Sequence, residues 1–455
     1  MEIANFMPLV SEAQILQALK AVNDPDLNRD IVSLGFVKNV KICDGNVAFD
    51  VELTTPACPV KDLLKQQAHD VVKALPNVTN VEVKMTAQTR GRPIGSADVL
   101  KGVKNVIAIA SGKGGVGKST ATTNLALSLV AMGAKVGILD ADVYGPSVPG
   151  MLGITERPRV NDEGKAIPPE AYGVKVMSVG MMMGDNDPGI WRGPIVSRIL
   201  QQFLGAVEWG ELDYLLMDLP PGTGDVQLTL TQSAPINGAV IVTTPQDVAL
   251  RIARKGLRMF QQVNVPILGI IENMSGFVCS NCGTVHDIFK RGGGGLAAAD
   301  MAVPLLGTIP LDPLMVQAGD LGKPLVALDK NSPGALAFEA VAKRIAAQIS
   351  IVNYNESLVK NRPKEMHLHD QNPPKIVWDD GAILMYSAFE LRMACPCAAC
   401  RDEMTGVKTL QEKDVPKDIK ILESRPVGRY GQNLVFSDGH ASGIYVNDLL
   451  RNLGR

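Results

Sequence analysis

The sequence predicts an α/β protein: a central domain built on a mostly parallel sheet, flanked by a small α+β domain and a small β-rich domain. Two observations lead to this prediction. Apolar strands alternate with helical patterns between residues 104 and 350, and segments rich in Gly, Pro or polar residues separate this stretch from both ends of the 455-residue chain. We expect the domains at residues 1–90, 104–350 and 366–455.

Composition narrows the class of protein. The chain is 46% hydrophobic and 20% charged, as in globular proteins with a substantial core, and its net charge of −2 gives no reason to expect nucleic acid as a partner. The first residues lack a basic segment followed by an apolar run, and no stretch of about 18 apolar residues occurs. We therefore expect no targeting segment and no contact with membranes. A cytoplasmic location follows, or the plastid stroma if the source is a plant and the chain is already processed.

The first domain reads as helix, two strands, helix and strand, expected at residues 13–22, 36–42, 46–53, 60–75 and 78–85. The dipeptide Asp44-Gly45 between the first two strands is a strong hairpin signal.

The central domain has near-continuous apolar strands, expected at residues 106–110, 135–139, 214–217, 239–242, 267–271 and 305–309. Such runs are typical of parallel strands that are covered on both faces. A polar hinge at residues 353–364 leads to the third domain, whose short strands are expected at residues 376–378, 382–385, 434–436 and 443–445.

A phosphate-binding motif follows the first central strand. The run Gly112-Lys113-Gly114-Gly115-Val116-Gly117-Lys118-Ser119 fits G-x-x-x-x-G-K-[ST] between a strand and a helix. Its backbone N–H groups would surround phosphate oxygens, Lys118 would reach the β- and γ-phosphates, and Ser119 would bind Mg²⁺. A Gly-rich turn that binds nothing is the alternative. We expect nucleotide contacts from Gly112, Lys113, Gly114, Gly115, Val116, Gly117, Lys118, Ser119 and Thr120.

The extra lysine, Lys113, makes KGGVGKST similar to the deviant Walker A group, which includes the nitrogenase iron protein and the MinD and ParA families. The resemblance implies an ATP-linked homodimer in which Lys113 contacts the partner's nucleotide and takes part in slow hydrolysis with Lys118. A lysine that merely solvates the loop is the alternative.

Carboxylates follow two of the central strands, where ligands bind in open α/β sheets. The resemblance implies that Asp142 orients the attacking water, that Asp140 lies near Mg²⁺, and that Asp218 holds Mg²⁺ directly or through water. A lone Asp after a strand is often only a helix cap.

Two further features match the same group. The segment LPPGTGD after Asp218 is similar to a switch loop, so Gly222, Gly224 and Asp225 are expected to move with nucleotide state. Asn273 matches an asparagine that contacts adenine in this group, although Asn also starts turns.

Several stretches narrow the resemblance to the Mrp family of iron–sulfur carrier ATPases: DADVYGPSVPGMLG, WRGPIVS, LDYLLMDLPPGTGD, TTPQDVALRIARKG and ENMSGFVCSNCG. This resemblance implies a [4Fe–4S] cluster that is held at a dimer interface and passed to apo-proteins, in contact with the cluster assembly machinery. Cys279 and Cys282 form a C-x-x-C pair with no second pair nearby, whereas a cluster or a zinc ion wants four ligands. Two chains would supply two cysteines each. A zinc knuckle with His286 near, or a redox disulfide, remains open.

The flanking domains carry further cysteines. The N-terminal segment resembles SufT-like iron–sulfur assembly domains through T-x-P-x-C-P, in which the cysteine is Cys58. Because Cys58 lies between a strand and a helix, we expect the helix dipole to lower its pKa and make it a reactive or cluster-contacting thiol. The alternative is a small buried apolar residue.

Cys395, Cys397, Cys400 and His440 form a complete Cys₃His set for structural Zn²⁺. Their segment resembles the small zinc-bearing N-terminal domain of γ-butyrobetaine hydroxylase. Free cysteines or a second cluster are the alternatives.

The favoured function is therefore an ATP-dependent iron–sulfur cluster carrier or scaffold. A MinD- or ParA-like positioning or regulatory ATPase with a structural zinc knuckle is the first alternative, and a reductase similar to the nitrogenase iron protein is the second.

Overall fold

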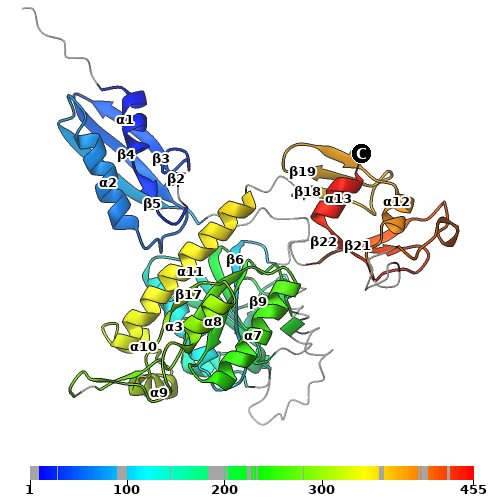
Figure 1. The fold of residues 1–455 in the computed structure, drawn as a ribbon. Helices are drawn as coiled ribbons and strands as arrows, with labels where there is room; N and C mark the ends of the chain where they lie inside the picture. The colour runs from blue at the N-terminus through cyan, green and yellow to red at the C-terminus, as the bar shows by residue number, and fades with distance from the viewer. Residues whose placement is uncertain are drawn as a thin grey trace, which may run out of the picture.

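The computed structural model describes residues 10–454 apart from residues 28, 90–99, 144, 183–198, 200–202, 223–226, 229, 232–233, 280, 358–362, 398–399, 401–407 and 428–430. Its elements confirm the predicted fold class, a central parallel sheet with smaller sheets before and after it in the chain (Figure 1).

The central sheet has eight strands within the described residues, in the order β10-β11-β7-β12-β6-β13-β14-β17. All neighbouring pairs are parallel except β10 with β11. All six strands predicted for this domain are present. The bounds are β6 (Val103–Ser111), β7 (Val136–Asp140), β10 (Glu170–Ala171), β11 (Val174–Ser178), β12 (Leu212–Asp218), β13 (Gly238–Thr243), β14 (Ile267–Glu272) and β17 (Leu305–Thr308).

Helices cover both faces of this sheet (Figure 1). Successive side chains of a strand point to opposite faces, so Ile107 and Ile109 join the cluster with α3 and α11, whereas Ala108 and Ala110 join the cluster with α7. Burial on both faces explains the uninterrupted apolar runs. The helices and minor elements are α3 (Lys118–Ala131), α4 (Val148–Met151), α7 (Asp247–Gln262), α8 (Gly293–Asp300), α9 (Pro313–Asp320), α10 (Leu325–Leu328), α11 (Pro333–Ser357), η1 (Val179–Met182), β8 (Arg159–Val160) and β9 (Ala166–Ile167).

The N-terminal domain packs two helices on a three-stranded sheet of order β3-β4-β5. Asp44 and Gly45 both have positive φ, 46° and 79°, which confirms the hairpin turn between β3 and β4. The bounds are α1 (Glu12–Leu19), β1 (Asn23–Asp24), β2 (Arg29–Asp30), β3 (Val37–Cys43), β4 (Asn46–Leu53), α2 (Lys61–Lys73) and β5 (Asn80–Ala87).

The C-terminal domain is β-rich, as predicted, with two antiparallel three-stranded sheets around one core in its described part. Strands β18 and β21 were not predicted. The bounds are β18 (Pro363–His367), β19 (Lys375–Trp378), β20 (Ile383–Met385), α12 (Ala388–Met393), η2 (Glu412–Asp414), β21 (Ile421–Val427), β22 (Gly431–Phe436), β23 (Ile444–Val446) and α13 (Asn447–Leu453).

The predicted polar hinge at residues 353–364 is partly wrong, because α11 continues to Ser357 and β18 begins at Pro363. Tertiary contacts hold this polar turn in the helix. The Asn353 side-chain amide donates to Asn105 Oδ1 at 2.8 Å, and Tyr354 packs against the N-terminal core.

The N-terminal domain contacts the central domain at the end of the sheet where β12 begins. The hydroxyls of Thr55 and Tyr214 are 2.7 Å apart and buried, and Ala57 joins the central core. Arg29 also donates to the Tyr354 hydroxyl at 2.8 Å. Because β12 ends at Asp218, this contact lies at the opposite end of the strand from that carboxylate.

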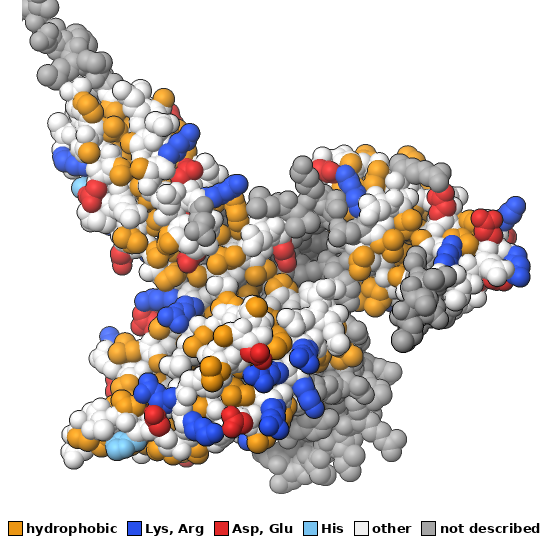
Figure 2. All heavy atoms as spheres, viewed as in Figure 1, with side chains coloured by type: hydrophobic (Ala, Val, Ile, Leu, Met, Phe, Trp, Pro, Cys, Tyr) orange, Lys and Arg blue, Asp and Glu red, His pale blue; other side chains and the backbone are white. Residues whose placement is uncertain are grey.

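The surface is mixed in charge. Figure 2 shows Lys and Arg side chains gathered over the face that α7 covers, where Arg251, Lys255 and Arg258 are exposed. None of the described helices is long and apolar enough to cross a membrane.

Candidate functional site

The loop between β6 and α3 has the backbone that the phosphate-binding motif requires. Gly115 and Gly117 have φ values of 79° and 81°, a region that favours glycine. A Cβ on Gly112 would lie 2.7 Å from the backbone of Ala253. Because α3 begins at Lys118, its unpaired N–H groups face the loop, where they favour an anion.

Lys118 and Ser119, which were predicted to bind phosphate and Mg²⁺, both donate hydrogen bonds to the Asp218 carboxylate. Lys118 Nζ donates to Asp218 Oδ2 at 2.7 Å and lies 3.6 Å from Asp142 Oδ2. The Ser119 hydroxyl donates to the same Asp218 oxygen at 2.6 Å. Both Lys118 and Asp218 are buried, so this cluster is largely shielded from water.

Asp140 completes a group of three carboxylates around one lysine. Its pKa is raised, first by burial and then by the Asp218 carboxylate, while a 2.9 Å hydrogen bond from the Ser178 hydroxyl opposes that rise. The surplus negative charge and the oxygen ligands suit a hard divalent cation such as Mg²⁺.

Two polar residues of this cluster were missed by the sequence reasoning. The Thr122 hydroxyl donates to Asp218 Oδ1 at 2.7 Å, and Ser178 donates to Asp140. Thr122 lies three residues after Ser119, on the same helix face, and Ser178 ends a parallel strand. Helix spacing and the strand-end rule were the signals that could have identified them.

A cavity of about 410 Å³ opens beside the loop. Gly117, Thr120 and Asn273 line one part of it, and Pro310 and Met315 contribute apolar surface. The size and mixed lining suit the base and ribose of a nucleotide. No motif marked residues 310–315.

Asn273 lies at the boundary between the cavity and the loop. Its side-chain Nδ2 donates to the Val116 carbonyl at 2.8 Å. Lys113 is exposed on the loop, where a second chain could reach it. Of the predicted switch residues, Gly222 donates from its backbone N–H to the Ser111 carbonyl at 3.0 Å, whereas Gly224 and Asp225 lie outside the described residues, as does the stretch 191–197.

Cys279 and Cys282 lie on a small hairpin, residues 277–286, which we call the cysteine finger. It is formed by β15 (Phe277–Val278) and β16 (Val285–His286), and the Cys279 N–H donates to the Thr284 carbonyl at 2.9 Å. Cys282 is exposed, and its hydrogen bond with the Thr284 hydroxyl lowers its pKa. The finger therefore presents the Cys282 thiol at the surface, with Cys279 partly buried beside it.

Cys58 corrects a prediction. Burial raises the pKa of its thiol to about 11, so desolvation outweighs any effect of the helix dipole. The helix begins only at Lys61, after Cys58. The thiol is therefore protonated at neutral pH in this conformation.

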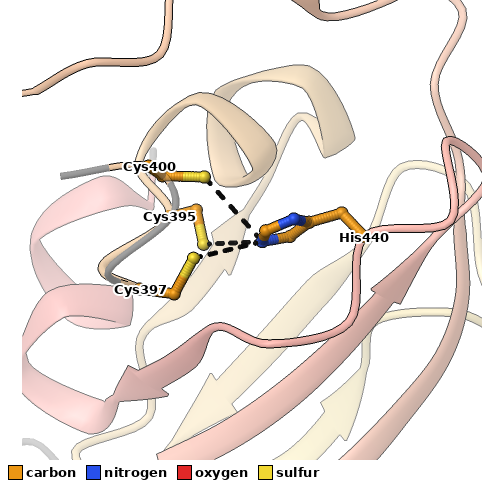
Figure 3. A group of neighbouring side chains, drawn as sticks. All are labelled: Cys395, Cys397, Cys400 and His440. Atoms are coloured by element: carbon orange, nitrogen blue, oxygen red, sulfur yellow. Dashed lines mark hydrogen bonds between the residues drawn. The ribbon is translucent and has the colours of Figure 1, made fainter.

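The C-terminal domain brings Cys395, Cys397, Cys400 and His440 together (Figure 3). Their ligand atoms all lie within 4.8 Å of one another, and His440 Nε2 is 3.1 Å from Cys395 Sγ. Four ligands at zinc distances of about 2.0–2.3 Å are separated by roughly 3.3–3.8 Å. A cubane instead places each thiolate on its own iron. The close spacing fits one metal ion better than a cluster.

Arg392 supports this group, although no motif in the sequence marks it. Its side chain is buried, its guanidinium donates to Cys400 Sγ at 3.3 Å and to Asp438 Oδ2 at 2.7 Å, and Asp438 accepts from the His440 backbone. Such outer contacts orient metal ligands and balance thiolate charge.

Comparison with known proteins identifies the central domain. Residues 102–346, more than half of the chain, match the model of the NUBPL iron-transfer P-loop NTPase family. The chain belongs to this family. In this member, residues 12–83 also match an iron-sulfur cluster assembly protein model, and residues 367–451 match the N-terminal region of γ-butyrobetaine hydroxylase-like proteins.

The family member has relatives along its whole length. It is 46% identical to the iron-sulfur cluster carrier protein of Synechocystis sp. over 74% of this chain and 97% of that protein. It is 41% identical to the chloroplastic Fe-S cluster assembly factor HCF101 of Arabidopsis thaliana over 98% of this chain and 83% of that protein. Among solved structures, an ADP-bound nucleotide-binding protein of Archaeoglobus fulgidus is 41% identical, covering 50% of this chain and 89% of that one, with a TM-score of 0.45.

Proposed function

We propose that this NUBPL-family protein is an ATP-dependent iron–sulfur cluster carrier that acts as a homodimer. Each chain supplies Cys279 and Cys282 to one shared [4Fe–4S] cluster, which is the cargo and passes to apo-proteins. The family and the names of the relatives support this function.

The observation that carries the proposal is the position of the cysteine finger. It follows β14 directly, at the same end of the sheet as the phosphate loop, and Cys282 is exposed. Within the described residues, the one group of three or more Cys, His, Asp or Glu side chains whose ligand atoms all lie within 4.8 Å of one another is in the C-terminal domain. The finger's thiols therefore need ligands from elsewhere to complete a four-ligand cluster, and a second chain supplies two.

The nucleotide site supplies the driving reaction. Lys118, which now donates to Asp218, would bind the β- and γ-phosphates of ATP, and Ser119 and Asp218 would hold the Mg²⁺ that neutralises the phosphate charge. Asp142 orients the attacking water, and Lys113 contacts the partner's nucleotide. Hydrolysis is slow and sets the timing of loading or release.

The C-terminal group is a separate structural site in this proposal. Cys395, Cys397, Cys400 and His440 hold one Zn²⁺, in keeping with their close spacing.

Anaerobic reconstitution with iron and sulfide tests the function. We expect about four iron atoms per two chains and one zinc per chain in the wild type. Cys279→Ala/Cys282→Ala should lose the iron and keep the zinc. Cys43→Ala, which removes another exposed thiol, is the matched control and should keep both metals.

Zinc at both sites with no iron uptake would refute the carrier and favour a zinc-stabilised regulatory ATPase. Iron that survives the double substitution would place the cluster elsewhere.

A further inference from the structure

A buried carboxylate, Glu272, lies between the nucleotide loop and the cysteine finger. It is the last residue of β14 and is fully buried. No lysine or arginine pairs with it among the ion pairs of the described residues. A buried carboxyl group without an ion-pair partner needs hydrogen bonds to compensate for its loss of water.

Those hydrogen bonds come from both ends of the segment that carries the cluster ligands. Before the finger, the Ser275 hydroxyl donates to Glu272 Oε1. After the finger, the N–H of Gly292 donates to Oε1 at 3.0 Å and the N–H of Gly294 donates to Oε2. Glu272 thus joins the segment before the finger to the segment after it. Its side chain also lies at the N-terminus of α8, where unpaired N–H groups favour negative charge.

The hydrogen bonds to Glu272, which we call the clamp, require one glycine of the run Gly292-Gly293-Gly294-Gly295, namely Gly294. A Cβ on Gly294 would lie 2.9 Å from Glu272 Cβ, and one on Gly293 would lie 2.5 Å from the Pro245 carbonyl. A Cβ on Gly295 would meet only Leu305, at an ordinary 3.7 Å. Gly294 must therefore lack a side chain for the backbone to approach Glu272, and Gly293 must lack one to pass Pro245.

The next residue, Asn273, holds the nucleotide loop. Its side chain donates to Val116 and touches Gly117 so closely that a Cβ there would lie 2.3 Å from Nδ2. Asn273 also lines the cavity beside the loop. Two adjacent residues therefore contact the two sites: Asn273 binds the phosphate loop, and Glu272 binds the segments on either side of the cysteine finger. No other residue lies between them in the chain.

We propose that Glu272 is a positioning residue that transmits nucleotide state to the cysteine finger. A nucleotide that engages Asn273 shifts the residue next to Glu272, and the clamp moves both ends of the finger together. Nucleotide binding then changes how exposed Cys279 and Cys282 are, and how firmly they hold cargo. The consequence for cargo rests on the proposed function, whereas the movement of the finger does not.

The test follows thiol exposure in the full-length protein without any cluster. Alkylation rates of Cys279 and Cys282 are measured peptide by peptide by mass spectrometry, with and without saturating Mg²⁺-ADP or a non-hydrolysable ATP analogue. Wild type should show a severalfold change in rate on nucleotide binding. Light scattering on the same samples reports the oligomeric state.

Two variants break the clamp from opposite sides. Glu272→Gln keeps the side-chain size but turns an N–H donor towards a backbone N–H, and Gly294→Ala pushes a methyl group against an intact Glu272. Both should lose the nucleotide effect on alkylation while nucleotide affinity and oligomeric state stay as in the wild type. Gly295→Ala is the matched control and should keep the effect.

A wild-type protein with no nucleotide effect, or a Glu272→Gln variant that retains it in full, would overturn the proposal. If Gly295→Ala lost the nucleotide effect on alkylation equally, the proposal would also be overturned, because the loss would then reflect a general destabilisation of α8. If the protein took up no iron but nucleotide still changed the alkylation rates, the carrier function would be refuted, whereas the coupling between the nucleotide site and the cysteine finger would stand.

Discussion

The Asp218 carboxylate accepts hydrogen bonds from three side chains, those of Lys118, Ser119 and Thr122. The first two partners were predictable, because the phosphate-loop motif and a carboxylate after an apolar strand are both visible in the sequence. Thr122 was missed, although it follows Ser119 by three residues on the same helix face, because no motif includes it. The pKa of Cys58 was predicted in the wrong direction because burial, which decides it, depends on tertiary packing.

At this residue scale, Lys118→Ala should abolish ATP hydrolysis and leave iron uptake by the reconstituted protein unchanged. The lysine stabilises transition-state charge, an effect worth roughly 10²–10³ in rate for a single donor, whereas the cluster thiols form a separate site. Phosphate release and iron content are the measurements, with exposed Lys135→Ala as the control. Equal loss of both activities would show that cluster uptake needs nucleotide.

At the scale of elements, strand positions followed from apolar runs, but helix ends depended on neighbours. The last turn of α11 is polar in sequence and was assigned to a hinge. It is helical because Asn353 and Tyr354 find partners in β6 and in the N-terminal domain. Partners this distant in sequence leave no local pattern. The contact between the 54–58 loop and β12 was unpredictable for the same reason.

The hydrogen bond between Thr55 and Tyr214 should therefore show coupling in a double-mutant cycle. Tyr214→Phe leaves the buried Thr55 hydroxyl without this partner, which costs about 1–3 kcal/mol, whereas Tyr214→Phe/Thr55→Val removes both hydroxyls and should cost less than the sum of the single changes. Hydrogen exchange at the Ala57 amide reports the opening of this contact. Strictly additive effects would show that the two hydroxyls do not interact in solution.

At the scale of the whole molecule, the fold class was readable from the alternation of strands and helices, and the site chemistry from spaced glycines, carboxylates and cysteines. The C-terminal domain has a small core of its own, and two cysteines of the Cys₃His group, Cys395 and Cys400, are part of that core. Small domains of this kind commonly draw stability from a bound metal.

Cys400→Ser should therefore unfold the C-terminal domain selectively. Zinc should fall from one per chain to none, and calorimetry should lose or lower one transition while the ATPase rate stays constant, because the central core is separate. Zinc binding to small peptides is worth on the order of 10 kcal/mol, so the shift should be large. Cys43→Ser provides the comparison. A uniform fall in every transition would mean that the domains unfold as one unit.

The N-terminal domain contacts the central domain at the start of β12, and this position affects the expected shape of a dimer. The phosphate loop and the cysteine finger share the far end of the sheet, so the homodimer that we propose, if it closes over them, would turn its two N-terminal domains outward, to the distal ends of the particle. Such a particle is elongated and tumbles slowly for its mass.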